Sequence, residues 1–409
     1  MLLEWLRVDW SLILESEKIV ISDKDPIEKW RRIGGAATEL LLHRSRSAVK
    51  SPINGDSENG FLFIKSMPRD DYDELFYAIY NSADLPNKLS IDIRTDTETS
   101  FSPMGLINLI RFALVAYRIR AASVLDWLFL FTRAIRTLEA YTHVRRTDYK
   151  HLVVFADMQL LDGLMVQIAK KRGLPTTTMQ HGLYIDYSNH FNVNIINYKN
   201  HIANYFLAWG KETAELIEKF HPDSQTVICG RPLKLKLPSR SPTKKYITLI
   251  CDQNLFFSYN LELLQIGYEF ARSRGLKLNL RMHPNNKLEW FRIDESLTIV
   301  NQDPMDSLFI IGHTSTLLYE CIASGIATFK YRSPIPANKT KPEICFSDTD
   351  ELVDISEHLL GDTTKLRQWG TYYIDSSGDD SVARYQKYFA EQDKQLSPCA
   401  AQSEALHAN

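Results

Sequence analysis

The sequence predicts an α/β protein made of two doubly wound, Rossmann-like domains in tandem. Short apolar runs of buried-strand type alternate with helical segments, and the alternation restarts after a proline-rich linker. The length of 409 residues also exceeds what one core usually holds. Ligands of open parallel sheets bind where the strands end. We therefore expect a central cleft lined by the carboxyl edges of both sheets.

Apolar runs bounded by turn residues predict the strands of the first domain, residues 1–232. These runs are 61–64, 89–93, 151–156, 175–179, 205–208 and 226–229. Acidic residues fit the first turn of a helix that starts near Asp70, and Gly173 fits a helix end. A further helix is predicted for 211–220.

A helical insertion is predicted at about 104–146, where arginines alternate with apolar residues. One interpretation is a membrane-surface helix pair close to a lipid-linked substrate, which predicts peripheral contact with an anionic membrane. The other is a core-packed pair with a solvated basic face.

The second domain, residues 246–391, follows a linker at 233–245 that contains prolines and lysines but no sustained periodicity. Its predicted strands are 246–251, 276–280, 297–300, 308–311 and 327–331. Residues 392–409 have little to bury, so we expect a disordered tail.

The composition excludes several classes of protein. A formal charge of -2 gives no general electrostatic reason to bind nucleic acid, and five scattered cysteines favour buried thiols in a reducing compartment. No run approaches the roughly 20 apolar residues of a membrane span. The glycine-rich motifs of dinucleotide and P-loop sites are missing, and no acidic pair ends a strand as a metal site would require. We expect neither a cofactor nor a metal.

The segment after strand 308–311 predicts a phosphate site. Gly312 permits a turn, and Thr314, Ser315 and Thr316 stand where a helix begins. The N–H groups, the partial positive charge and the hydroxyls of such a turn suit a phosphate or diphosphate. Glu320, about one turn later, could contact a ribose. The alternative is an ordinary Ser/Thr helix cap.

A second polar cluster, containing Arg281, His283 and Pro284, follows strand 276–280. If this strand lies beside strand 308–311 in a parallel sheet, Arg281 and His283 face the predicted phosphate. Together with Lys330 and the helix start, they would neutralise a leaving phosphate without a divalent ion.

The turn after strand 175–179 carries a candidate base, His181, between Gln180 and Gly182, which we place on the acceptor side. An imidazole titrates near pH ~6.5 and can accept a proton from a hydroxyl group. Asp157 and Asp186 are alternative bases, or partners that orient His181. His181 could instead be a structural residue bonded to the loop backbone.

Five stretches of the chain resemble bacterial surface-polysaccharide glycosyltransferases of the GT-B fold. They are MQHG (179–182), FLAWGKETAELIEKF (206–220), ICGRP (228–232), LRMHP (280–284) and GHTSTLLYECIASGIATF (312–329). The His-Pro and Ser/Thr cluster is similar to sialyltransferases and Kdo transferases, which use CMP-sugars. The His-Gly is similar to CDP-glycerol glycerophosphotransferases, where that histidine is held to be the base. Where the sialyltransferases carry an acidic motif, this chain has Gln180, His181 and Gly182.

The resemblance implies a metal-independent, inverting glycosyltransferase. Its donor would be a nucleotide sugar. A CMP-sugar is the favoured donor, and a UDP-sugar is the second choice. Its acceptor would be a glycan or lipid-linked glycan of a capsule, O-antigen or lipooligosaccharide. We expect it in the cytoplasm, at the inner face of the bacterial inner membrane. The alternatives are a CDP-glycerol-type glycerophosphotransferase and a non-catalytic binding protein with the same fold.

Overall fold

The computed structural model describes residues 60–66, 70–92, 148–182, 198–236, 245–252, 256–283, 286–333 and 342–396, together with the single positions 30, 31, 34 and 137. Four predicted features lie outside these residues: Asp186, Pro284, the insertion at 104–146 except position 137, and the tail from 397 onward. In the described part of the chain, no helix combines the length and the apolar character needed to cross a membrane.

The first domain is built around a six-stranded parallel sheet with strand order β2-β1-β3-β4-β5-β6. The strands are β1 (Phe61–Lys65), β2 (Lys88–Asp92), β3 (His151–Val154), β4 (Thr176–Met179), β5 (Tyr205–Ala208) and β6 (Gln225–Ile228). Both faces of such a sheet are covered, and every residue of β1, β3 and β4 is buried. The strands predicted from the sequence are confirmed to within about two residues.

The second domain holds another six-stranded parallel sheet, with order β12-β11-β10-β7-β8-β9. Its strands are β7 (Tyr246–Ile250), β8 (Lys277–Arg281), β9 (Thr298–Val300), β10 (Ile310–Gly312), β11 (Thr328–Tyr331) and β12 (Cys345–Phe346). Together the two sheets confirm the prediction of two Rossmann-like domains. One condition of the sequence analysis was wrong: β8 and β10 are not neighbours, because β7 lies between them.

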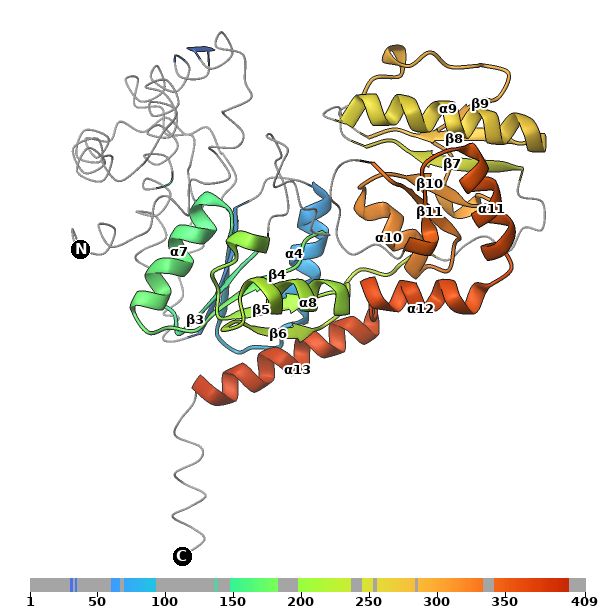
Figure 1. Cartoon of the computed structure of the whole chain (residues 1–409). Helices are drawn as coiled ribbons and strands as arrows, with labels where there is room; N and C mark the ends of the chain where they lie inside the picture. Colours follow the sequence, from blue (N-terminus) through green and yellow to red (C-terminus); the bar gives the residue numbers. More distant parts are fainter. Residues whose placement is uncertain are drawn as a thin grey trace, which may run out of the picture.

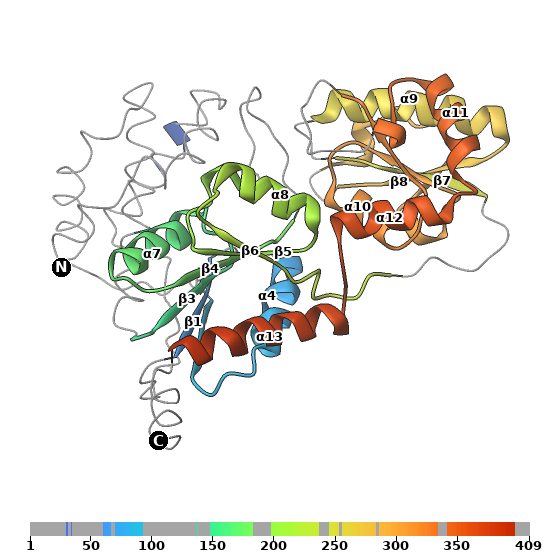
Figure 2. The same cartoon turned by 60° about the horizontal axis from the view of Figure 1, so that its bottom comes forward.

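Helices cover both faces of both sheets (Figures 1 and 2). In the first domain they are α4 (Asp70–Ser82), α7 (Leu160–Lys171) and α8 (Lys211–Phe220), and in the second α9 (Phe257–Arg274), α10 (Thr316–Ala323), α11 (Thr349–Leu359) and α12 (Thr363–Tyr373). Gly275, in the left-handed conformation with φ 62°, ends α9. Asp348 and Asp362 cap α11 and α12 by accepting from the amides of Glu351 and Lys365.

Helix α13 (Asp379–Leu396) returns from the second domain and lies against the first sheet (Figures 1 and 2). The hydroxyls of Tyr388 and Thr177 lie 2.6 Å apart, and the ring of Phe389 packs on Phe61 and Phe63. The sequence analysis placed residues up to 391 with the second domain and the tail from 392. Helix α13 instead contributes to the core of the first domain and continues to Leu396.

Phe389→Ala tests whether α13 is part of that core. The Phe389 side chain is fully buried, so its removal should lower the free energy of unfolding by about 3 to 5 kcal/mol. Lys387→Ala, on the exposed side of the same helix, should change it by less than about 0.5 kcal/mol. Urea unfolding followed by circular dichroism measures both. Equal midpoints for the two variants would contradict this packing.

Candidate functional site

The carboxyl ends of β7 and β10 mark the place in the second domain where a ligand is expected. From β7 the chain adds strands in one direction, through β8 and β9, and from β10 in the other, through β11 and β12. The point where this direction reverses is the usual ligand site of a doubly wound sheet. Asp252 follows β7, and His313 and Thr314 follow β10, so these three residues meet at the reversal point.

The carboxylate of Asp252 gathers hydrogen-bond donors from the turn after β10. Its Oδ2 accepts from the Thr314 amide at 2.9 Å and from the Thr314 hydroxyl, and it lies 3.6 Å from His313 Nδ1. The backbone of Asp252 is fixed as well, because the side chains of Asn260 and Asn286 both donate to its carbonyl oxygen. Sequence analysis missed Asp252 and His313, although each lies within two residues of the end of a strand.

This contact changes the phosphate site predicted at the start of α10. The two donors of Thr314 are directed to Asp252, and Ser315 caps the helix by accepting from the amide of Leu317 at 3.3 Å. The ordinary cap that the sequence analysis left open as an alternative is therefore present. Ser315 and Thr316 are half-buried, and they lie beside Gly312 at the same sheet edge.

A residue after β8, Asn286, contacts Asp252. Arg281 is exposed at the end of β8 and His283 is half-buried. The next described residue, Asn286, donates to the Asp252 carbonyl at 2.7 Å. Because β7 lies between β8 and β10, Asp252 at the end of β7 lies between the ends of these two strands.

His181 lies in a turn that polar contacts hold on both sides. Gln180 accepts from the amide of Trp209 at 2.6 Å and donates to the carbonyl of Gly182 at 3.0 Å. The hydroxyl of Tyr198 donates to the same Gly182 carbonyl at 2.6 Å. This network fixes the backbone on both sides of His181 at the carboxyl end of β4.

Aromatic rings surround the imidazole of His181, which is almost fully buried. The rings of Phe155, Tyr72 and Tyr198 have centroids 5.3, 5.6 and 6.5 Å from it. Tyr72 belongs to α4, the helix that follows β1. The candidate base therefore lies next to the point where the first sheet reverses direction, between β1 and β3.

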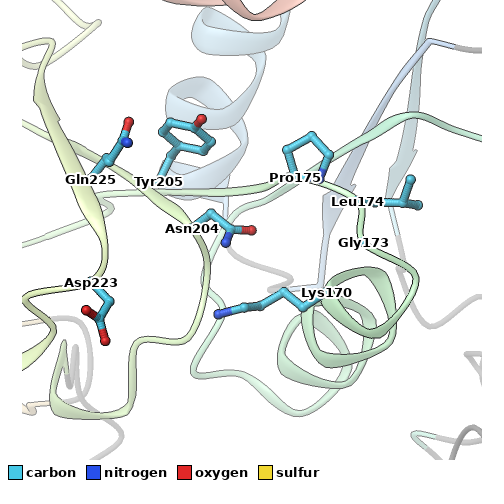
Figure 3. Close-up of a pocket in the computed structure, with 8 residues that line it drawn as sticks. All are labelled: Lys170, Gly173, Leu174, Pro175, Asn204, Tyr205, Asp223 and Gln225. Carbon is cyan, nitrogen blue, oxygen red and sulfur yellow. The ribbon is translucent and has the colours of Figure 1, made fainter. Parts of the chain in front are cut away.

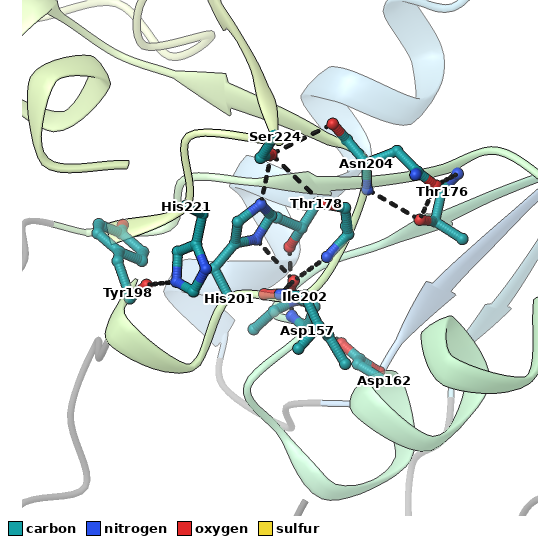
Figure 4. Close-up of polar contacts among 12 residues, drawn as sticks. Asp157, Asp162, Thr176, Thr178, Tyr198, His201, Ile202, Asn204, His221 and Ser224 are labelled. Atoms are coloured by element: carbon teal, nitrogen blue, oxygen red, sulfur yellow. Dashed lines mark hydrogen bonds and ion pairs between the residues drawn. The ribbon is translucent and has the colours of Figure 1, made fainter. Parts of the chain in front are cut away.

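Asp157, the second candidate base, holds a neighbouring segment of the chain (Figure 4). Its Oδ2 accepts from the amides of Ile202 and Ala203 at 2.7 and 2.8 Å and lies 2.7 Å from His201 Nδ1. Burial alone would raise the pKa of Asp157, but the charge and hydrogen bond of His201 and the two amides lower it below the usual value. This geometry supports a structural role for Asp157, which holds residues 201–203.

Two buried residues with ionisable side chains lie near the carboxyl edges of the two sheets. Lys330, in register with Gly312 on β11, is buried in the second domain, and Glu212 is buried in the first turn of α8 in the first. Burial lowers the pKa of Lys330 to about 8. The charges of Cys345, Glu212 and Asp252 act in the opposite direction and raise it.

A cavity of about 360 Å³ lies away from all of these residues, at the amino edge of the first sheet (Figure 3). It is lined by Lys170, Gly173, Leu174, Pro175, Asn204, Tyr205, Asp223 and Gln225. None of the predicted site residues lines it. In the described residues, no group of three or more His, Cys, Asp or Glu side chains could hold a metal ion.

Solved structures share the architecture of this chain. A protein from Listeria monocytogenes, assigned to the UDP-N-acetylglucosamine 2-epimerases, aligns with 82% of this chain and 98% of its own, at 11% identity and a TM-score of 0.53. The UDP-GlcNAc 2-epimerase of Methanocaldococcus jannaschii, in complex with UDP-GlcNAc and UDP, aligns with 82% of this chain and 100% of its own, at 12% identity and a TM-score of 0.50. No protein-family model matches the chain, and no curated protein matches it significantly. At this identity the likeness shows the fold alone: the chain has the GT-B architecture of two Rossmann-like domains.

Asp162→Asn tests a buried carboxyl beside Asp157. Burial is the main reason that the pKa of Asp162 rises from 3.8 to about 7, although the Ala156 amide donates to it. A pKa raised in the folded state means that the stability this group provides is complete below about pH 3.8 and is lost as the pH rises through about 7. The asparagine still accepts from Ala156 and does not ionise. The variant should therefore lose less stability than the unsubstituted chain between about pH 5 and pH 8.

Urea midpoints measured across this pH range decide the point. Asp350→Asn, which changes an exposed carboxylate, should keep the pH profile of the unsubstituted chain. Parallel profiles for all three proteins would show that Asp162 is already ionised when folded.

Proposed function

We propose that this chain is a glycosyltransferase that moves a sugar from a nucleotide-activated donor to a hydroxyl group of a bacterial surface glycan. The observation that carries the proposal is the meeting of the two carboxyl edges, seen in the ion pair of 3.3 Å between Arg231, which follows β6, and Glu320 on α10, which follows β10. A base on one edge and a phosphate site on the other could then act on a single bond. The His-Pro and the Ser/Thr turn favour a CMP-sugar as donor, and a UDP-sugar is the second choice.

In this proposal His181 takes the proton of the acceptor hydroxyl while the acceptor oxygen forms a bond to the anomeric carbon. The bond from that carbon to the donor phosphate oxygen breaks, and the phosphate leaves with the electron pair. Attack opposite the leaving phosphate inverts the anomeric configuration. The hydrogen bonds of Gln180 and Tyr198 support this role, because they hold the turn that carries His181.

The negative charge of the leaving phosphate requires compensation at the edge of the second sheet. Lys330 and the amino end of α10 provide positive charge there, and His283 adds a donor from the other side of Asp252. We therefore propose a metal-independent reaction. The carboxylate of Asp252 fixes the turn after β10, so the phosphate would bind beside Thr314 and not on its amide.

His181→Ala should abolish transfer and leave nucleotide affinity nearly unchanged. A general base contributes about 10²- to 10⁴-fold in rate, and this loss should appear in turnover. Product formation with a glycan acceptor and a binding isotherm for the nucleotide give the two measurements. His358→Ala, on the exposed face of α11, is the matched control. Near-normal turnover of a folded His181→Ala variant would move the base to a carboxylate such as Asp186.

Lys330→Met and His283→Ala should weaken binding of a nucleotide without weakening binding of the matching nucleoside. Each loses one contact to phosphate, worth about 1 to 3 kcal/mol. A thermal-shift panel of CMP, CDP, UDP and GDP selects the nucleotide, and calorimetric titration compares it with its nucleoside. Lys287→Met, an exposed lysine near β8, is the control.

The panel also separates the alternatives. A preference for CMP supports transfer of an acidic sugar, UDP supports transfer of a hexose, and CDP supports a glycerophosphotransferase. If none of the four nucleotides binds, the chain does not use a donor of this class.

A further inference from the structure

Arg231 lies where the two crossings between the domains meet. The first crossing leaves β6 through Gly230 and Arg231, and the second, residues 374–378, joins α12 to α13. The Arg231 amide donates to the Ser376 carbonyl at 2.8 Å, and the Gly378 amide donates to the Arg231 carbonyl at 3.1 Å. The backbone of Arg231 is therefore fixed to both crossings.

Gly230 makes this close approach possible. Its φ is 84°, a left-handed value that suits glycine, and a Cβ atom at this position would lie 2.2 Å from the Ser376 hydroxyl. The hydroxyl of Tyr385, from α13, donates to the Gly230 carbonyl at 3.1 Å. Backbone contacts alone thus fix the direction of the chain at Arg231, independently of the contacts of its side chain.

The guanidinium of Arg231 makes three contacts. One nitrogen lies 3.3 Å from Oε1 of Glu320, and another donates to the Leu233 carbonyl at 3.1 Å. The guanidinium carbon is 5.9 Å from the centre of the Trp209 ring, within the range of a cation–π contact. The Arg231 and Glu320 side chains are only 15% and 22% exposed, so salt screens their ion pair less than a surface pair.

Glu320 belongs to the other domain. It lies on α10, one turn after Thr316, on the helix that begins where the second sheet reverses direction. Glu320 is also the residue expected to contact the ribose of the donor. The side chain that fixes this carboxylate therefore comes from the domain that carries His181.

We propose that Arg231 is a positioning residue that orients Glu320 toward the donor ribose. The site for the nucleoside half of the donor is then complete only when the two domains have the arrangement seen here. The inference rests on the proposed nucleotide-dependent function and adds to it a link between the domains. A carboxylate that is already oriented loses less conformational freedom when the donor binds. Arg231 contacts no reacting atom in this scheme.

The test compares ribonucleotides with analogues that lack the hydroxyls Glu320 would hold. CMP and UDP, each beside its 2′,3′-dideoxy form, are titrated calorimetrically into the unsubstituted chain and the variants Arg231→Gln, Arg231→Lys and Glu320→Gln. Arg231→Gln should weaken the ribonucleotide that binds by roughly tenfold to a hundredfold, the range for one charge-assisted hydrogen bond. It should weaken the dideoxy form by less than about twofold, because no bond to Glu320 exists there.

Further variants separate positioning from general stability. Arg231→Lys keeps the charge but not the planar fork, so we expect an intermediate loss. Arg231→Gln combined with Glu320→Gln should be no worse than Glu320→Gln alone. Arg367→Gln, an exposed arginine of the interdomain helix α12, should change neither titration.

The results distinguish failure of this inference from failure of the proposed function. If a nucleotide binds and Arg231→Gln weakens the ribo and dideoxy forms equally, or weakens neither, Arg231 does not position Glu320. If the unsubstituted chain binds neither CMP nor UDP, the proposed donors are wrong and the role of Arg231 toward them falls as well. A thermal-unfolding cycle of the two single variants and the double variant, without nucleotide, then shows whether the ion pair itself links the domains.

Discussion

The carboxylate of Asp252 is the contact on which the second half of the candidate site depends. Two donors of Thr314 converge on one oxygen, which also lies 3.6 Å from His313 Nδ1, and two asparagines hold the backbone of the same residue. A buried carboxylate is costly unless it is hydrogen-bonded, and this one is bonded on the side that faces β10. Its contacts therefore determine the relative positions of the ends of β7, β8 and β10. The placement of any phosphate ligand must accommodate this negative charge.

The interface between the domains repeats this use of buried polar contacts. Across it, Arg231 lies 3.3 Å from Glu320 on α10, and the hydroxyl of Tyr372 in α12 donates to Glu215 in α8 at 3.0 Å. One cluster of buried apolar side chains also extends from the first sheet to the α10 side of the second. The apolar contacts supply non-directional attraction, while the ion pair and the hydrogen bond favour one relative orientation of the two domains.

Much of the fold could be predicted from the sequence because buried parallel strands are apolar runs of recognisable length. The runs ending in Ala156, Met179 and Cys251 all proved to contain or border strands. Their lateral order could not be predicted, because a single sequence gives the succession of strands and not their neighbours. For this reason the sequence analysis could only assume that β8 and β10 are neighbours, and it did not single out Asp252. An aspartate after a strand can have many structural roles. Asp252 becomes a candidate site residue only when the strand order shows that it lies at the reversal point.

The remaining differences have the same origin. His201, the partner of Asp157, follows a stretch without a periodic pattern, so nothing in the sequence connects it to a carboxylate more than forty positions earlier. Gly230, Arg231 and Pro232 belong to a stretch that carries the family resemblance. The contact of Arg231 with Glu320 could not be predicted from it, because this contact depends on how the domains pack. For His181 the sequence indicated the place at the end of β4, because the residue follows an apolar run of strand length by two positions. It also indicated the turn, because Gly182 comes next.

The position of α13 has a consequence for how the protein is made. The helix completes one face of the first sheet, yet the ribosome synthesises it after every strand of the second. While the chain is growing, the aromatic side chains of β1 that later pack on Phe389 lack this contact. The first domain therefore cannot finish folding on emergence, as amino-terminal domains commonly do. Until α13 is synthesised, its nascent sheet lacks these apolar contacts and exposes the kind of surface that chaperones bind.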